Sequence, residues 1–293
     1  MKIVSQKKGI LIFYAFDLIL VILFFIILIP FTKKNNPAEM ESALINPDYV
    51  KDISSISITG FDTDGSKKGI SFKKRGNIWT GSSSLSNYSF VWPCDSQTIE
   101  NLIAVSSRVN KMYKVGESIS SWKSFEVDEK NSICITFYDS DVSTLSSIYY
   151  GKDNPLNQRI AFRTWSKDAV YEVDDTILPY LNTDESFWCD PFIYPQCLTG
   201  YDRKTSESLL RRGQLANISP REGLTSDALI RHDFENGARI ELACYHRDDA
   251  YVVIPFFTAG PASSEGEKEV LNSLNYRYTI SEWTFDKLLS ENK

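Results

Sequence analysis

The pattern of hydrophobic and polar residues divides the chain into one long apolar run and a much longer mixed remainder. The run extends from Ile10 to Phe31, about 22 residues, enough for a helix to cross a bilayer at ~1.5 Å per residue. No comparable run follows it. The pattern therefore predicts a short tail (1–9), one transmembrane helix (10–31) and a large domain on one side of the membrane.

A cleaved signal peptide is the alternative to a membrane anchor. The apolar run exceeds the usual signal-peptide length of about 7–15 residues, and the exit from Pro30 to Lys34 lacks the small residues of a cleavage site. Lysines at positions 2, 7 and 8 and the α-amino group precede the run, whereas only Lys33 and Lys34 follow it. This excess favours a cytoplasmic N-terminus. We therefore expect an uncleaved, single-pass protein of the inner membrane with an extracytoplasmic C-terminal domain.

Asp17 interrupts the apolar run, and two interpretations of it stay open. A carboxylate inside a bilayer is costly, and such residues often contact a partner helix or a polar cavity. Alternatively, the apolar neighbours offset the cost of one Asp near the interface, or the carboxyl group is protonated. On the first interpretation, Asp17 is the candidate contact with a partner inside the membrane.

Beyond the run, short alternating segments predict strands, and a few segments with helical spacing predict helices. Residues 32–50 are polar, contain two prolines and predict a stalk. The expected strands lie near residues 56–58, 133–137, 148–150 and 276–280, and the expected hairpins lie near 70–80, 159–173 and 239–257, the last with its turn at 246–249. The expected helices are 96–113, 205–212 and a C-terminal helix after Ser281. The fold class is therefore α+β: a β-rich ectodomain of antiparallel sheets with a few helices, over residues 51–195, and a C-terminal α+β region over 196–293.

Three strand-turn-strand units recur along the chain. They lie near residues 70–80, 159–173 and 239–256, at intervals of roughly 80–90 residues. This interval indicates a duplicated α+β unit, although the three units share little sequence.

Charge and composition limit the classes of partner. The chain has a net charge of −6, and its first 34 residues carry five lysines and one aspartate, which leaves −10 for the remainder. An acidic ectodomain repels nucleic acid and anionic lipid, so neither is expected as its main partner. Aromatic residues make up 13% of the chain, which favours a β-rich domain with aromatic cores.

The cysteines allow one disulfide prediction. The chain has five cysteines, at positions 94, 134, 189, 197 and 244. Only Cys189 and Cys197 are close in sequence, and Pro191 and Pro195 between them favour a turning loop that a disulfide can close. The alternative is that all five are small buried thiols, a common state of free cysteine.

No catalytic, cofactor-binding or metal-binding constellation is recognisable. Only two histidines are present, His232 and His246, and neither lies in a known motif or beside a Gly-x-Ser-x-Gly elbow. Phosphate-binding glycine motifs are absent. The Asp-rich turn at Asp62 has lysines where a calcium loop needs Gly and Glu, and the cysteines lack the short spacing of a zinc site. We predict a protein that is not an enzyme and needs no cofactor.

The tryptophans are open to two interpretations, core packing or a binding surface. They are Trp79, Trp92, Trp122, Trp165, Trp188 and Trp283. Several fall in strand-like or amphipathic contexts, which favours the core.

Several short motifs resemble one bacterial family. An Ile-x-Ile strand at Ile56 follows the apolar run, and the other motifs are Gly76–Trp79, Pro93–Asp95, Tyr150–Gly151 and Ala169–Val173. Over roughly residues 45–195, the chain resembles the bacterial domain-of-unknown-function family 4340. The resemblance implies a membrane-anchored protein outside the cytoplasm, associated in some members with ABC transporters of the gliding-motility type. The family has no established catalytic residues to transfer.

Three functional classes follow from these observations. The first is a non-enzymatic, membrane-anchored envelope protein that binds or scaffolds partners, with ABC transporter subunits implied by the resemblance alone. The second is an extracytoplasmic binding module for a small ligand or envelope polymer, with an aromatic groove. The third is an envelope hydrolase, which the many carboxylates leave open.

Overall fold

The computed structural model describes most of the chain beyond residue 38. The described residues are 18–20, 39–61, 64–83, 90–195, 211–216, 225–234, 237–247 and 250–291. Within these ranges, no helix has both the length and the apolar composition needed to cross a bilayer. The expected transmembrane helix lies outside them except for Leu18, Ile19 and Leu20, which are helical and exposed. The membrane anchor therefore stays a prediction.

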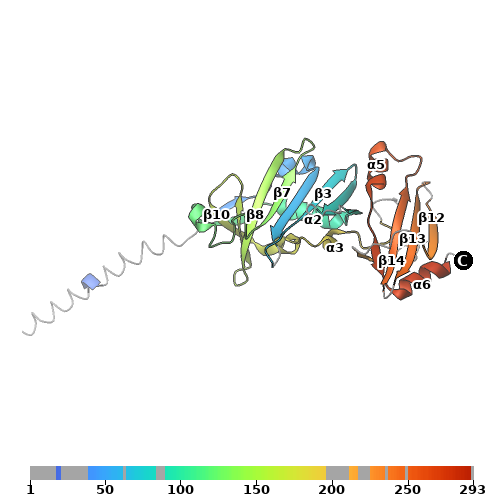
Figure 1. The fold of residues 1–293 in the computed structure, drawn as a ribbon. Helices are drawn as coiled ribbons and strands as arrows, with labels where there is room; N and C mark the ends of the chain where they lie inside the picture. The colour runs from blue at the N-terminus through green and yellow to red at the C-terminus, as the bar shows by residue number, and fades with distance from the viewer. Residues whose placement is uncertain are drawn as a thin grey trace, which may run out of the picture.

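Two antiparallel sheets and a few short helices make up the described part of the chain, so the α+β fold class is confirmed (Figure 1). The first sheet has ten strands in the order β1-β6-β10-β9-β8-β7-β2-β3-β4-β5. Its strands are β1 (Glu39–Ser42), β2 (Ser55–Phe61), β3 (Lys67–Arg75), β4 (Ile78–Ser83), β5 (Val91–Pro93), β6 (Asn110–Gly116), β7 (Ile133–Tyr138), β8 (Thr144–Asn154), β9 (Arg159–Thr164) and β10 (Val170–Asp174).

The second sheet has five strands in the order β11-β15-β14-β13-β12. They are β11 (Gln214–Leu215), β12 (Ala228–Asp233), β13 (Arg239–Arg247), β14 (Ala250–Thr258) and β15 (Tyr278–Ile280). The α-helices are α2 (Ser96–Ser107), α3 (Glu185–Trp188), α5 (Glu265–Ser273) and α6 (Glu282–Glu291), and the 3-10 helices are η1 (Pro47–Asp52), η2 (Ile119–Ser121) and η3 (Asp175–Tyr180). Figure 1 shows α5 and α6 at opposite ends of the second sheet.

The stalk expected over residues 32–50 does not extend over 39–50. Strand β1 pairs antiparallel with β6 at the edge of the first sheet, and Leu44 and Ile45 enter the hydrophobic core. The polar sequence of β1 is that of an edge strand, whose residues alternate between exposed and half-buried. Such a strand lacks the apolar alternation by which the other strands were predicted.

Helix α2 begins as predicted but ends earlier. Asp95 caps it by accepting a hydrogen bond from the amide of Gln97, and Ile99 and Leu102 are fully buried. The helix ends at Ser107, and the chain then forms β6, in which Met112 is buried opposite β1. The helix predicted over 96–113 was therefore too long, because an apolar residue in the following strand falls at helical spacing by coincidence.

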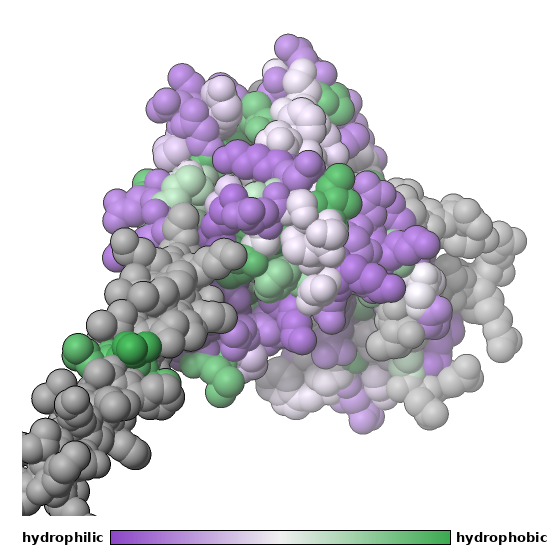
Figure 2. All heavy atoms as spheres, turned by 90° about the vertical axis from the view of Figure 1, so that its left-hand side faces the viewer, coloured by the Kyte–Doolittle hydropathy of each residue, from purple (hydrophilic) through white to green (hydrophobic). Residues whose placement is uncertain are grey.

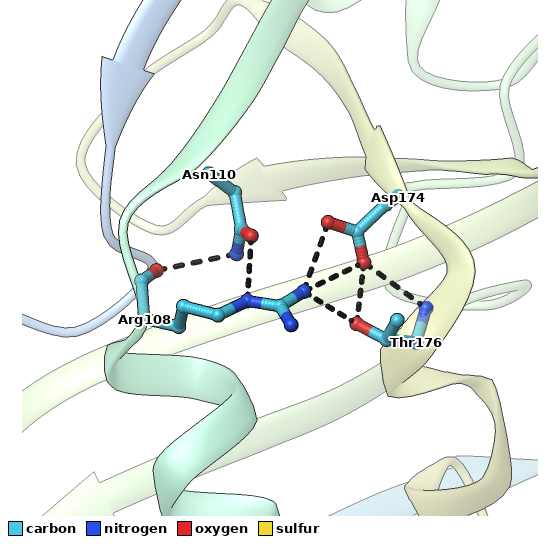
Figure 3. A network of polar contacts seen from close by, with 4 residues as sticks. All are labelled: Arg108, Asn110, Asp174 and Thr176. Carbon is cyan, nitrogen blue, oxygen red and sulfur yellow. Dashed lines mark hydrogen bonds and ion pairs between the residues drawn. The ribbon is translucent and has the colours of Figure 1, made fainter.

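A network of polar contacts joins the end of α2 to the end of β10 (Figure 3). Nη2 of Arg108 donates to both carboxylate oxygens of Asp174 at 3.1 Å and to the hydroxyl of Thr176 at 3.1 Å. Nε of Arg108 donates to the side-chain oxygen of Asn110 at 2.9 Å. Arg108 and Asp174 are half exposed, so the network orients the chain more than it stabilises it.

The core of the first sheet is built around aromatic rings. Phe72 on β3 contacts Trp92 edge-on at 6.1 Å between ring centroids and Trp188 at 4.9 Å. Trp79 is also buried, so the core interpretation holds for these three tryptophans. Gly81 on β4 lies opposite both Phe72 and Trp92, and only a glycine leaves room for the indole there.

The two sheets share one hydrophobic core and meet through α3, α5 and β15. The hydroxyl of Tyr278 on β15 donates to the carbonyl of Asp190 at 2.6 Å. On the other side of the junction, Ile78 of β4 packs against Val270 and Leu271 of α5. The C-terminal region thus packs on the first sheet.

The three recurring hairpins do not fall into matching sheets. The hairpins β3-β4 and β9-β10 both lie in the ten-stranded sheet, and β13-β14 lies in the five-stranded sheet. The two sheets differ in strand number and order. The duplicated unit stays a prediction.

Gly81 provides a test of the aromatic core. A Cβ on Gly81 would lie 2.1 Å from the Trp92 ring, which is fully buried and has no room to move. We expect Gly81→Ala to lower the free energy of unfolding of the full chain by about 1–3 kcal/mol, measured by urea titration with tryptophan fluorescence. Gly266→Ala in α5, where a Cβ meets nothing within 4 Å, is the matched control and should be neutral or slightly stabilising. An unchanged unfolding midpoint for Gly81→Ala contradicts this packing.

Candidate functional site

The two faces of the ten-stranded sheet differ in chemistry. On β2, Ile56 and Ile58 are buried in the core, whereas Ser55, Ser57 and Thr59 between them are half-buried on the opposite face. Strand β7 repeats the pattern, since its Ile135 and Phe137 lie in the core. Because side chains alternate along a strand, the face opposite the core is polar. We call it the polar face.

A continuous row of hydroxyl side chains crosses the middle of the polar face. Five neighbouring strands each contribute one Ser or Thr, and the register places each of these residues opposite the one on the adjacent strand. The row, here named the hydroxyl row, consists of Ser82 (β4), Ser71 (β3), Ser57 (β2), Thr136 (β7) and Ser147 (β8). Neighbouring strands lie about 4.8 Å apart, so the row presents hydroxyl groups at that interval.

The two ends of the hydroxyl row differ in accessibility. Thr136 and Ser147 are 8% and 9% exposed, and their hydroxyl oxygens lie 2.9 Å apart in a hydrogen bond. Ser57, Ser71 and Ser82 are half-buried. Within the described part of the chain, the hydroxyls of Ser71 and Ser82 have no hydrogen-bond partner and are not enclosed. These two hydroxyls are therefore available to a ligand.

Both ends of the polar face are covered. At the β4 end, α5 packs over Ile78. At the β10 end, the segment around η2 lays Phe125 and Val127 over Ala161 and Val170. This segment touches the sheet so closely that a Cβ on Gly151 would lie 2.1 Å from the carbonyl of Phe125. The open part of the polar face thus lies between these two ends.

Arg163 occupies the covered end of the polar face beside β8. It lies opposite Tyr149 on β8, and its guanidinium carbon is 3.7 Å from the centre of the Tyr149 ring and 3.8 Å from the centre of the Trp122 ring. Its Nε donates to the carbonyl of Val127 at 2.7 Å. The side chain is 3% exposed, and no carboxylate in the described ranges lies within ion-pair distance of it.

The rings around Arg163 are themselves held in place. The indole nitrogen of Trp122 donates to the carbonyl of Asp168 at 2.8 Å. Burial raises the pKa of Tyr149, whose other strand neighbour is Cys134, so the phenol stays neutral near Arg163. Trp165, two residues beyond Arg163, is 61% exposed. Its backbone amide donates to the carbonyl of Ser147 at 3.0 Å, which extends the pairing with β8 by one hydrogen bond. An exposed indole therefore stands at the end of the hydroxyl row.

The end of the molecule that faces the viewer in Figure 2 is mainly hydrophilic. Figure 2 shows this end with hydrophilic residues in the majority and hydrophobic ones in small separate groups. The view offers no broad apolar surface. Polar recognition is therefore the chemistry that this end of the first sheet supports.

The two histidines do not share a site. His232 lies between the rings of Tyr194 and Phe234, where burial lowers its pKa, and it pairs opposite Ile240. His246 stacks on Tyr251 at 4.5 Å between centroids. Positions 240 and 246 are separated by roughly 20 Å along β13. His246 belongs to this strand, whereas the sequence placed it in a turn. Among the described residues, no group of His, Cys, Asp and Glu could hold a metal ion.

The expected disulfide and membrane contact lie partly or wholly outside the described residues. Cys189 is present as a buried thiol, with its sulfur 3.8 Å from the hydroxyl of Tyr278, and burial raises its pKa. Cys197 and Asp17 lie outside the described residues. Both the pairing of Cys189 with Cys197 and the partner contact of Asp17 stay predictions.

The comparisons with protein families and with curated proteins give no relative. No protein-family model matches the chain, and no curated protein matches it. The resemblance to the domain-of-unknown-function family 4340 therefore stays an expectation. The fold and the site define a two-sheet α+β protein with an open polar sheet face.

The thiols provide a test of burial and of the predicted disulfide. Burial raises the pKa of Cys134, Cys189 and Cys244, that of Cys244 to about 12. Because the thiolate is the reacting species, a raised pKa lowers its fraction at neutral pH. We expect iodoacetamide to modify these three cysteines only after urea unfolding, as measured for each peptide by mass spectrometry. Fast labelling of Cys134 or Cys244 in the native chain contradicts the structure.

The same experiment separates a free thiol from a disulfide at Cys189. Unfolding without reductant exposes a free Cys189 to iodoacetamide. If Cys189 pairs with Cys197, both stay unmodified in urea until a reductant is added. Cys244, which has no expected partner, is the internal control.

Proposed function

We propose that the chain is a membrane-anchored, non-enzymatic binding protein of the cell envelope. Its domain lies outside the cytoplasm and uses the polar face to hold an extended, hydroxyl-rich polymer such as an envelope glycan. The observation that carries this proposal is the hydroxyl row, whose five members are aligned across five strands.

The chemistry of the hydroxyl row suits a carbohydrate. A Ser or Thr hydroxyl both donates and accepts a hydrogen bond, as a sugar hydroxyl does, so the two groups pair without a fixed polarity. Trp165 at the end of the row offers an exposed apolar ring surface for a sugar ring to lie against. The charge of −10 beyond residue 34 disfavours a densely anionic polymer.

Location supports the same proposal. The apolar run over 10–31 is long enough to anchor the chain, and the lysine excess before it favours an extracytoplasmic domain. An anchored protein with an exposed polar face is held where an envelope polymer is abundant. A tethered binding domain gains effective concentration without any new contact.

A second candidate is an accessory subunit of an ABC transporter. Its support is the family resemblance and Asp17, the one acidic residue inside the apolar run. On this proposal the main contact is made within the membrane, and the polar face has a secondary role.

Binding to an envelope glycan tests the first proposal. The full chain in detergent should co-sediment with purified peptidoglycan. The double variant Ser71→Val/Ser82→Val should bind at least about fivefold more weakly, because it loses two hydrogen bonds to the glycan. Valine favours β-strands, so the sheet itself should be retained. Thr258→Val removes an exposed strand hydroxyl from the second sheet and is the matched control. Equal co-sedimentation of the double variant and the control contradicts a role for the hydroxyl row.

Asp17 tests the second proposal. Asp17→Leu should leave membrane insertion intact, because the change makes the apolar run continuous. If a membrane partner contacts Asp17, the variant should recover clearly less of the proteins that co-purify with the full chain, as quantified by mass spectrometry. Ile19→Leu is the control for a neutral change in the same run. Unchanged recovery of every co-purifying protein removes the evidence for this contact.

A further inference from the structure

Arg163 is a buried cation without a counter-ion. Other arginines of the described ranges lie within 4.0 Å of a carboxylate, among them Arg75, Arg108, Arg159, Arg231, Arg239 and Arg247. Arg163 is buried, yet no carboxylate of the described ranges lies within 4.0 Å of it. Asp128, next to the Val127 carbonyl that Arg163 contacts, is occupied by the side chain of Asn131 and the amide of Lys130.

The surroundings of Arg163 compensate its charge only in part. Burying a charged group is costly unless it is paired and hydrogen-bonded. The rings of Trp122 and Tyr149 attract the cation, and Val127 accepts one hydrogen bond from Nε. The two terminal nitrogens of the guanidinium have no hydrogen-bond acceptor in the described part of the chain.

The free edge of the guanidinium is the edge that binds anions. The Trp122 and Tyr149 rings both lie within 4 Å of the guanidinium carbon, and Nε is already used. Nη1 and Nη2 have no partner and are not among the enclosed polar atoms, so they reach solvent. A planar pair of N–H groups matches the two oxygens of a carboxylate or phosphate.

Arg163 is also fixed before any ligand binds. Trp122 is held by the carbonyl of Asp168, and Tyr149 is held in β8 opposite Arg163. A ligand that meets a fixed guanidinium does not have to order a long, flexible side chain, which favours binding. The low water content around the group also strengthens its attraction for a negative charge.

We propose that Arg163 binds a single carboxylate or phosphate group of the ligand that lies on the polar face. The inference deepens the proposed function, because it adds one anionic group to an otherwise neutral polymer. Arg163 lies at the end of the cross-strand row of residues that runs beside the hydroxyl row. The exposed Trp165 lies two residues further along the chain, just after β9. The ligand would thus be a glycan that carries isolated acidic groups.

A structural role for Arg163 is the competing explanation. By donating to Val127, Arg163 fastens the segment around η2 to the sheet, and this alone would explain its burial. The two explanations differ in one measurable respect: only the anion site responds to a free anion.

The test is a titration of the full chain in detergent with sodium acetate and, separately, inorganic phosphate at constant ionic strength. The readout is the NMR signal of the Trp122 indole N–H, which lies against Arg163. We expect a saturable shift at millimolar anion for at least one of the two probes. A response to acetate alone identifies a carboxylate as the ligand group, and a response to phosphate alone identifies a phosphate. The absence of a saturable shift with either probe overturns the proposal.

Matched variants separate the anion site from the structural role. Arg159→Gln is the control: it is on the same strand and its guanidinium lies over the Tyr113 ring, but it already pairs with Glu172. We expect wild-type affinity for Arg159→Gln, about tenfold weaker binding for Arg163→Lys, which keeps the charge but not the planar fork, and loss of the shift for Arg163→Gln. Equal affinity of wild type and Arg163→Lys contradicts the proposal, and this comparison stands even if Arg163→Gln fails to fold.

The outcome is separable from that of the glycan assay. Anion binding without co-sedimentation rejects the glycan and keeps the anion site. Co-sedimentation that depends on Ser71 and Ser82, with no response to either anion, keeps the glycan and rejects the anion site.

Discussion

One-sided burial of the ten-stranded sheet is the constraint on which the rest of the structure depends. Side chains alternate strictly along each strand, so the aromatic and branched residues that fill the core leave every second position on the opposite face. On β2 and β7, those positions carry Ser, Thr, Cys and Tyr, with Phe61 at the end of β2. The polar face therefore follows from the same alternation that builds the core. A shift of one strand by one residue would exchange the two sets of side chains and disrupt both the core and the polar face.

The junction with the second sheet keeps the polar face partly open. Helix α5 covers Ile78 at one end, and Tyr278 holds the segment after α3 on the core side. Neither contact reaches the middle strands β2 and β7. The C-terminal region therefore packs on the β3–β4 side of the sheet, and these contacts leave the polar face of the middle strands uncovered.

The sequence predicted elements whose signals are local and missed those that depend on distant partners. The start of α2 was predictable because Asp95 caps an apolar stripe, and the start of α6 because Ser281 accepts a hydrogen bond from Thr284. Helix α5 was not predicted, because its capping box at Ser264 directly follows Gly260 and Pro261, which favour a loop. The hydroxyl row and the Arg163 site were beyond prediction, because positions 57, 71, 82, 136 and 147 meet only through the register of strands far apart in sequence.

The pairing of β1 with β6 limits how far the domain can stand from a membrane. The expected transmembrane helix ends at residue 31, and β1 begins at Glu39 as part of the sheet. A fully extended chain covers no more than about 30 Å between these two points. With the helix inserted as proposed, the sheet edge formed by β1 and β6 has a short tether, and the domain samples only a thin layer above the bilayer. A partner buried deep in the envelope would have to reach this layer by itself.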